Sequence, residues 1–164
     1  MVFVLLLALS IIDWRYKAVP DSLNLLALFF AIAFSPILGF QYALLFAGGF
    51  TLLRFLISYY LFKKFTLLEQ KRKPASWRKE YDIFPSFEAM GEADIIVAAT
   101  IGAILGIQVG IFAIFLSALL TLPVALIRLK TDSQTPFVPF LAMALFISFL
   151  FFPYIDSWIG SLYV

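Results

Sequence analysis

Long apolar runs separated by short polar stretches follow one another along this chain. A helix that crosses a bilayer needs roughly 20 mostly apolar residues, and lipid offers no hydrogen bonds to any other backbone conformation. The pattern therefore predicts an all-α, polytopic integral membrane protein that forms one domain over residues 1–164. The six predicted transmembrane segments are Val2–Ile12, Leu23–Phe40, Tyr42–Phe62, Asp94–Leu105, Val109–Ile127 and Phe137–Tyr154.

Composition supports this interpretation and limits the chemistry. Of the 164 residues, 63% are hydrophobic and 13% are charged, whereas soluble domains have about 45–50% apolar and about 25% charged residues. The chain has no Cys and no His, which excludes disulfides, Cys–His or Ser–His nucleophile pairs and His-ligated metals. We therefore expect any catalysis to use carboxylates, hydroxyls, Lys or Tyr, with no cofactor, no metal and no nucleic-acid partner.

The basic residues predict the orientation in the membrane. Cytoplasmic loops of membrane proteins carry an excess of Lys and Arg. The connections at Gly39–Gln41 and Gly106–Val109 contain neither residue, so we place them and both termini outside a plasma (inner) membrane. One long cytoplasmic loop is expected at about residues 63–93. Apart from Arg54, all Lys and Arg residues lie in three segments, Arg15–Lys17, Lys63–Lys79 and Arg128–Lys130.

Two carboxylates lie at the edges of predicted membrane segments. Asp13 follows the first apolar run and Asp94 opens the fourth, so the topology places both at similar depth on the cytoplasmic side. Two carboxylates that are brought close together share a proton, and an aspartic protease uses such a pair to activate water and polarise a carbonyl. The alternative is that each Asp only caps a helix, which is favourable near an N-terminus.

Three stretches then resemble a known family. The run IDWRYKAVPD over residues 12–21 is similar to the D-x-R-x-x-x-I-P-D stretch of type IV prepilin peptidases. MGEAD over 90–94, followed by AATIGAILG over 98–106, resembles their G-x-G-D and A-A-x-G-A-x-L-G signature. PFVPFLA over 136–142 is similar to the P-F-G-P-F-L-A that opens the last helix of that family.

The resemblance implies a membrane aspartyl endopeptidase that removes the leader of prepilins or pseudopilins, after a Gly and before their apolar helix. Asp13 and Asp94 match the family's two catalytic aspartates. The expected partners are that substrate helix and the lipid bilayer. The sequence departs from the family pattern at Ala93, Ile96 and Val138.

A further departure concerns zinc. Bacterial members commonly carry an N-terminal segment with zinc-binding Cys pairs that is linked to methylation of the trimmed pilin. The present sequence contains no Cys. We therefore expect no N-terminal zinc or methylation segment and peptidase activity without methyltransferase activity.

Small residues recur every fourth position after Asp94 and predict close helix packing. Residues at this spacing share one helix face, and small ones let membrane helices approach each other. We expect this stripe to bring a second carboxylate within reach and to meet Gly48–Gly49 on the third segment. The members of the stripe are Asp94, Ala98, Gly102, Gly106 and Gly110.

Arg54 is the one charge deep inside an apolar segment. We expect it to pair with a carboxylate, and the alternative is that its long stem reaches toward the cytoplasmic face. Two other classes of function stay open at this point. A small ion-coupled transporter would use Asp13, Arg54 and Asp94 as an ion path. A catalytically impaired pilus or secretion assembly factor would keep the fold without the chemistry, and the departures Ala93 and Ile96 favour it.

Overall fold

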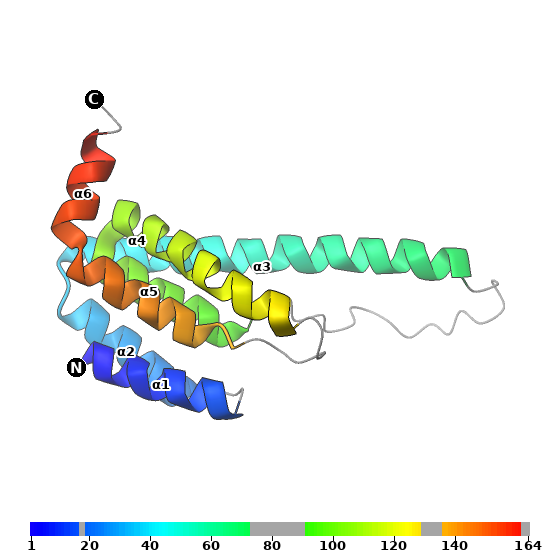
Figure 1. Cartoon of the computed structure of the whole chain (residues 1–164), viewed down its shortest axis with the longest axis horizontal. Helices are drawn as coiled ribbons and strands as arrows, with labels where there is room; N and C mark the ends of the chain where they lie inside the picture. Colours follow the sequence, from blue (N-terminus) through cyan, green and yellow to red (C-terminus); the bar gives the residue numbers. More distant parts are fainter. Residues whose placement is uncertain (17–18, 73–90, 129–135, 162–164) are drawn as a thin grey trace.

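The computed structural model describes residues 1–16, 19–72, 91–128 and 136–161, and every regular element in this part of the chain is a helix (Figure 1). The all-α prediction is confirmed for these residues. In chain order the helices are α1 Val2–Tyr16, α2 Asp21–Ala33, α3 Ile37–Arg72, α4 Glu92–Arg128, α5 Val138–Leu150 and α6 Phe152–Ser161.

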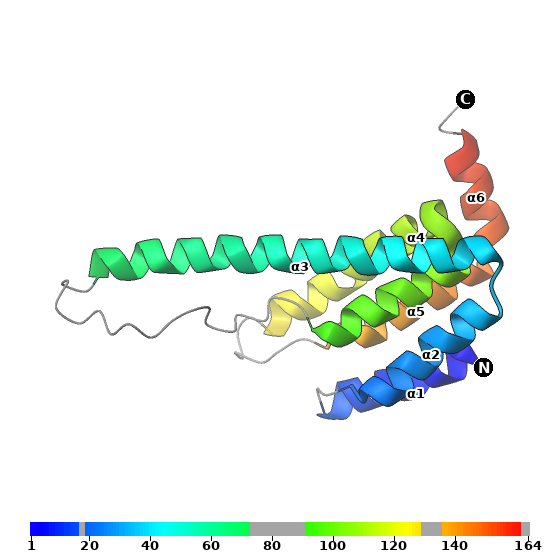
Figure 2. The same ribbon diagram turned by 180° about the vertical axis from the view of Figure 1, so that it is seen from behind.

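The helix α4 lies in the middle of the bundle, where it packs against α2, α3 and α5 (Figures 1 and 2). Its buried residues Val97 and Ile101 belong to the main apolar core, together with Leu6 and Leu9 of α1 and Leu141 of α5. Large apolar side chains cover much of the outer surface as well, such as Phe29, Phe55 and Phe115. An apolar exterior of this extent is that of a protein surrounded by lipid.

The chain reverses direction within α4, at Gly106. This residue has φ +74° and ψ −172°, a region of backbone space that only Gly adopts without strain. The two arms on either side run back along each other (Figures 1 and 2), which agrees with the connection predicted at Gly106–Val109. The small-residue stripe therefore does not follow one helix, since Gly110 belongs to the second arm.

Glycines on both arms of α4 pack against the side chain of Phe46 on α3. A Cβ atom added to Gly102 would lie 2.5 Å from Cδ2 of Phe46, and one added to Gly110 would lie 2.8 Å from its Cζ. The expectation that Gly48–Gly49 is the partner surface is wrong, because both residues are exposed and an added Cβ would contact nothing within 4 Å.

Helix length and composition support a membrane protein but do not establish six crossings. In the described part of the chain, Ile37–Tyr60 and Glu92–Ile127 are long and apolar enough to cross a bilayer, although Glu92–Ile127 includes the reversal at Gly106. The pair α5 and α6 would add a third span if it is counted as one broken helix, and α2 is a shorter apolar helix. The number six stays a prediction.

At two places the helix boundaries differ from the prediction, and a proline explains each difference. The connection expected at Gly39–Gln41 lies instead between the end of α2 at Ala33 and the start of α3 at Ile37. Pro36 occupies this break and disfavours helical backbone in the residue before it. The predicted segment Phe137–Tyr154 is divided into α5 and α6, which are bent by 80°. Pro153 cannot donate the backbone hydrogen bond that would continue α5.

The long polar loop starts later than predicted. Helix α3 continues through Arg72, so its C-terminal part extends past the other helices (Figure 1). The expected loop at about 63–93 is therefore wrong at its beginning, and α4 already starts at Glu92. The remainder of that loop, residues 73–90, lies outside the described part of the chain.

Candidate active site

Four helix ends meet at one end of the bundle and carry the two predicted aspartates. Asp13 lies in the last turn of α1 and Asp94 in the first turn of α4. The start of α2 and the start of α5 lie at the same end (Figures 1 and 2). The side chains are nearly buried, with 7% of Asp13 and 9% of Asp94 exposed. The Asp13 carboxylate lies near enough to Asp94 to act on it electrostatically.

The Asp13 carboxylate is held by the start of α5. It accepts a hydrogen bond from the main-chain N–H of Val138, the first residue of that helix, whose N–H has no partner inside α5. The positive end of the α5 dipole compensates the unfavourable position of Asp13 at the C-terminal end of α1. Burial raises the pKa of the Asp13 carboxyl above its usual range, and the Val138 hydrogen bond opposes this effect. The other carboxylate oxygen, Oδ2, is buried and has no hydrogen-bond partner in the described structure.

Asp94 both caps its helix and faces the site. Its carboxylate accepts a hydrogen bond from the main-chain N–H of Gly91, which immediately precedes α4. A carboxylate at this position reaches back to the first free N–H of the helix in the manner of a capping box. The capping alternative is thus partly correct, but it does not replace the interaction with Asp13.

Arg54 has the carboxylate partner that we expected. Its Nη1 lies 3.3 Å from Oε1 of Glu92, and the pair joins the middle of α3 to the start of α4. Glu92 is 73% exposed along its side chain, so the ion pair borders the site without entering its buried part.

A family model for the type IV leader peptidase family matches residues 1–126. The chain belongs to this family. The matched residues include Asp13 and Asp94 and all of the described part of α3. The comparison with curated proteins and the comparison with solved structures each give no match.

The departures from the leader peptidase pattern fit the observed backbone. Ala93 replaces a Gly of the family motif but has helical backbone angles within α4, where the described break is at Gly106 alone. Val138 also replaces a Gly, and its contribution to Asp13 is a main-chain N–H that every residue except Pro provides. Ile96 stands where the family has Lys and is half-buried; the structure gives no explanation for this replacement.

One buried polar residue next to the aspartates escaped the sequence analysis. Asn24 of α2 is completely buried, and its Nδ2 donates a hydrogen bond of 3.0 Å to the carbonyl oxygen of Ala93. Its one sequence signal is a polar amide inside the apolar run Leu23–Phe40. The motif comparison gave this position no weight, since it lies just beyond the residues that match the family pattern.

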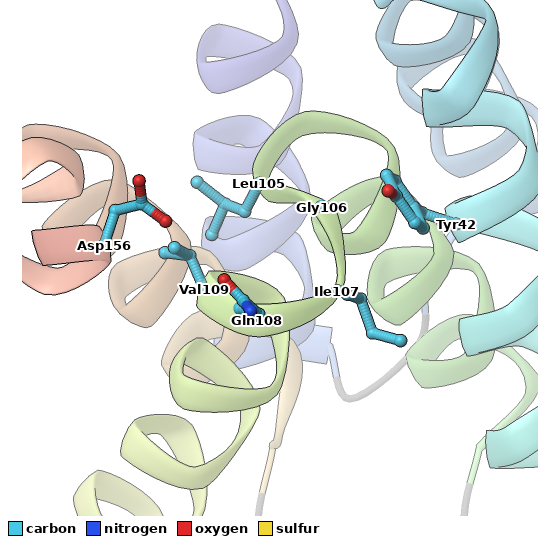
Figure 3. Close-up of a pocket in the computed structure, with 7 residues that line it drawn as sticks. All are labelled: Tyr42, Leu105, Gly106, Ile107, Gln108, Val109 and Asp156. Atoms are coloured by element: carbon cyan, nitrogen blue, oxygen red, sulfur yellow. The ribbon is translucent and has the colours of Figure 1, made fainter. Parts of the chain in front are cut away.

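A separate pocket of about 330 Å³ lies at the other end of the bundle (Figure 3). It surrounds the reversal of α4, and Asp156 of α6 supplies its carboxylate. The first arm of α4 separates it from Asp94 by about 18 Å at 1.5 Å per residue, so it takes no part in the aspartate pair. Its lining residues are Tyr42, Leu105, Gly106, Ile107, Gln108, Val109 and Asp156. Within the described residues, no three carboxylates are grouped as a metal site would require.

Proposed function

We propose that this chain is a membrane aspartyl endopeptidase that removes the leader peptide of type IV prepilins or pseudopilins. The observation that carries the proposal is the placement of two nearly buried and electrostatically interacting carboxylates, Asp13 of α1 and Asp94 of α4, at the same end of the bundle. The family to which the chain belongs supports a peptidase of this kind.

In the proposed reaction the two carboxylates share one proton. The ionised carboxylate takes a proton from a water molecule as that water attacks the scissile carbonyl carbon. The protonated carboxyl donates a hydrogen bond to the carbonyl oxygen, on which negative charge develops. Collapse of the tetrahedral intermediate breaks the C–N bond, and the leaving amine takes a proton from the pair. Proximity of the two carboxylates and their partly dry surroundings are what this chemistry requires.

The substrate in this proposal is partly a membrane helix. Its apolar segment would lie in the bilayer beside the enzyme, and the peptide bond after the leader's last Gly would then reach Asp13 and Asp94 at the membrane edge. The basic connections favour a plasma (inner) membrane location with the site on the cytoplasmic face and six crossings in total. We expect no methyltransferase activity.

Cleavage of a model prepilin by the purified protein in detergent tests the proposal. The parent protein is expected to cut after the leader's final Gly, and mass spectrometry of both products identifies the bond. Asp94→Asn is expected to lower kcat at least about 1,000-fold, since a neutral amide cannot move the proton. Asp156→Asn, at the opposite end of the bundle, is the matched control and should keep parental activity.

A parent protein that folds but leaves every prepilin intact would contradict the proposal. The alternative of an assembly factor would then be favoured. A secretion or piliation assay would test it, because an assembly factor should tolerate Asp94→Asn. Activity that survives in Asp94→Asn would reject the carboxylate mechanism even if cleavage occurs.

A further inference from the structure

The buried amide of Asn24 connects two helices at the residue before Asp94. Asn24 lies in the first turn of α2, and none of its surface is exposed. Its Nδ2 donates to the Ala93 carbonyl oxygen at 3.0 Å. The carbonyl of Ala93 has a second lone pair for the hydrogen bond of its own helix. The amide thus fixes the start of α4 relative to α2 without disturbing α4.

The other half of the amide is left without a partner. Oδ1 of Asn24 is buried and accepts no hydrogen bond in the described structure. The same is true of Asp13 Oδ2 and Ser148 Oγ. An unsatisfied buried acceptor lowers the stability of the fold. Two of these three atoms belong to residues at the aspartate end of the bundle, Asp13 and Asn24.

Asn24 also belongs to the helix that follows Asp13 in the chain. The short connection after α1 ends at Pro20, whose carbonyl accepts the main-chain N–H of Asn24 at 3.2 Å. The same residue therefore contacts, through its backbone, the connection that follows Asp13 and, through its side chain, the residue that precedes Asp94. Among the described side chains, that of Asn24 is the one whose hydrogen bond reaches the residue before Asp94.

We propose that Asn24 is a positioning residue of the aspartate pair, which holds Asp94 opposite Asp13 through the Ala93 carbonyl. It touches neither the reacting atoms nor the shared proton in this role. The kinetic consequence rests on the proposed peptidase function, whereas the positioning itself concerns the structure alone. The competing explanation is that the amide only joins α2 to α4, as polar side chains do between membrane helices.

The test compares Asn24→Ala with Ser148→Ala. Both changes remove a completely buried polar side chain that carries an unpartnered oxygen, but only the first removes a hydrogen bond to α4. Ser148 lies near the C-terminal end of α5, about 15 Å along that helix from Val138. A loss of general packing should affect both variants, and a loss of positioning should affect Asn24→Ala alone.

We expect Asn24→Ala to lower kcat for prepilin cleavage by about 10- to 100-fold with KM within about twofold, because a small displacement of a catalytic group costs this much. Its unfolding midpoint should match that of Ser148→Ala. Amide hydrogen exchange in the first two turns of α4, residues 92–98, should quicken about fivefold to tenfold, as expected for the loss of one hydrogen bond. Ser148→Ala should keep parental kcat and exchange.

A kcat of Asn24→Ala within twofold of the parent would overturn the proposal, and so would a loss of kcat that Ser148→Ala shares. If Asn24→Ala does not fold, Asn24→Thr takes its place, since it keeps the volume but shortens the reach. If the parent protein cleaves no prepilin, the proposed peptidase function is rejected, but the positioning role of Asn24 is not. The exchange measurement then still decides, because unchanged exchange in residues 92–98 would overturn the positioning role.

Discussion

Asp13 of α1 interacts with residues of two other helices, α4 and α5. Its carboxylate belongs to α1, its hydrogen-bond donor Val138 belongs to α5, and its electrostatic neighbour Asp94 belongs to α4. A negative charge at the end of α1 is unfavourable for that helix alone. The start of α5 stabilises the carboxylate at this position, and the other carboxylate oxygen, Oδ2, has no hydrogen-bond partner in the described structure.

The ion pair of Arg54 and Glu92 leads to a prediction at this scale. Exposed ion pairs contribute about 0–1 kcal/mol to stability, and Glu92 is 73% exposed. We expect Glu92→Gln to lower the free energy of unfolding in detergent by at most about 1 kcal/mol. A loss of 3 kcal/mol or more in urea titrations followed by circular dichroism would show that the pair holds α4 in place.

The aspartates could be predicted from the sequence, whereas their partners could not. Asp13 and Asp94 interrupt apolar runs and match family motifs, so both the pattern and the resemblance pointed to them. The donor from Val138 is a main-chain N–H, which leaves no trace in the side chain of that residue. The partner of Asn24 is a carbonyl on another helix, and only the tertiary fold brings the two groups together.

Helix boundaries depend on features that hydropathy does not distinguish. The apolar run Leu23–Phe40 contains both α2 and the start of α3, because the residues on either side of Pro36 are equally apolar. Beyond Phe62 the chain becomes polar and yet remains helical through Arg72. A helix of polar residues that are good helix formers has the same average polarity as a loop, so the apolar pattern ended too early.

The reversal at Gly106 gives a prediction for one element. A side chain at φ +74° and ψ −172° costs about 1–3 kcal/mol, so Gly106→Ala should lower the free energy of unfolding by that amount. Gly48→Ala is the matched control, since an added Cβ there meets open space and Ala is the better helix former by about 1 kcal/mol. Equal stabilities of the two variants would contradict the tight reversal.

At the scale of the whole molecule, charge and helix arrangement support one orientation. The aspartate end of the bundle contains Arg15, and the basic C-terminal part of α3 extends past this end (Figure 1). The end with the Gly106 reversal has a single described charged side chain, Asp156. The distribution of Lys and Arg predicts that the aspartate end faces the cytoplasm. Several of the helices are shorter than the roughly 20 residues that a full crossing of the bilayer requires.

Thiol labelling in intact cells can check this orientation, since the natural sequence has no Cys that would interfere. We expect a membrane-impermeant maleimide to label Phe34→Cys and Gln108→Cys from outside. Arg15→Cys should react only after the membrane is permeabilised. Labelling of Arg15→Cys in sealed cells would reverse the topology and place the aspartates on the wrong side for a leader peptide that enters from the cytoplasm.

The most direct measurement compares the single variants Asp13→Asn and Asp94→Asn with the double variant in the prepilin cleavage assay. When two groups act as a unit, removing either one abolishes the contribution of both to kcat. The second substitution should therefore lower kcat almost no further than the first. We therefore predict that each single variant loses nearly all of the kcat that the double variant loses. Losses that multiply, or a single variant that keeps more than about a tenth of the parental kcat, would contradict a shared role for Asp13 and Asp94.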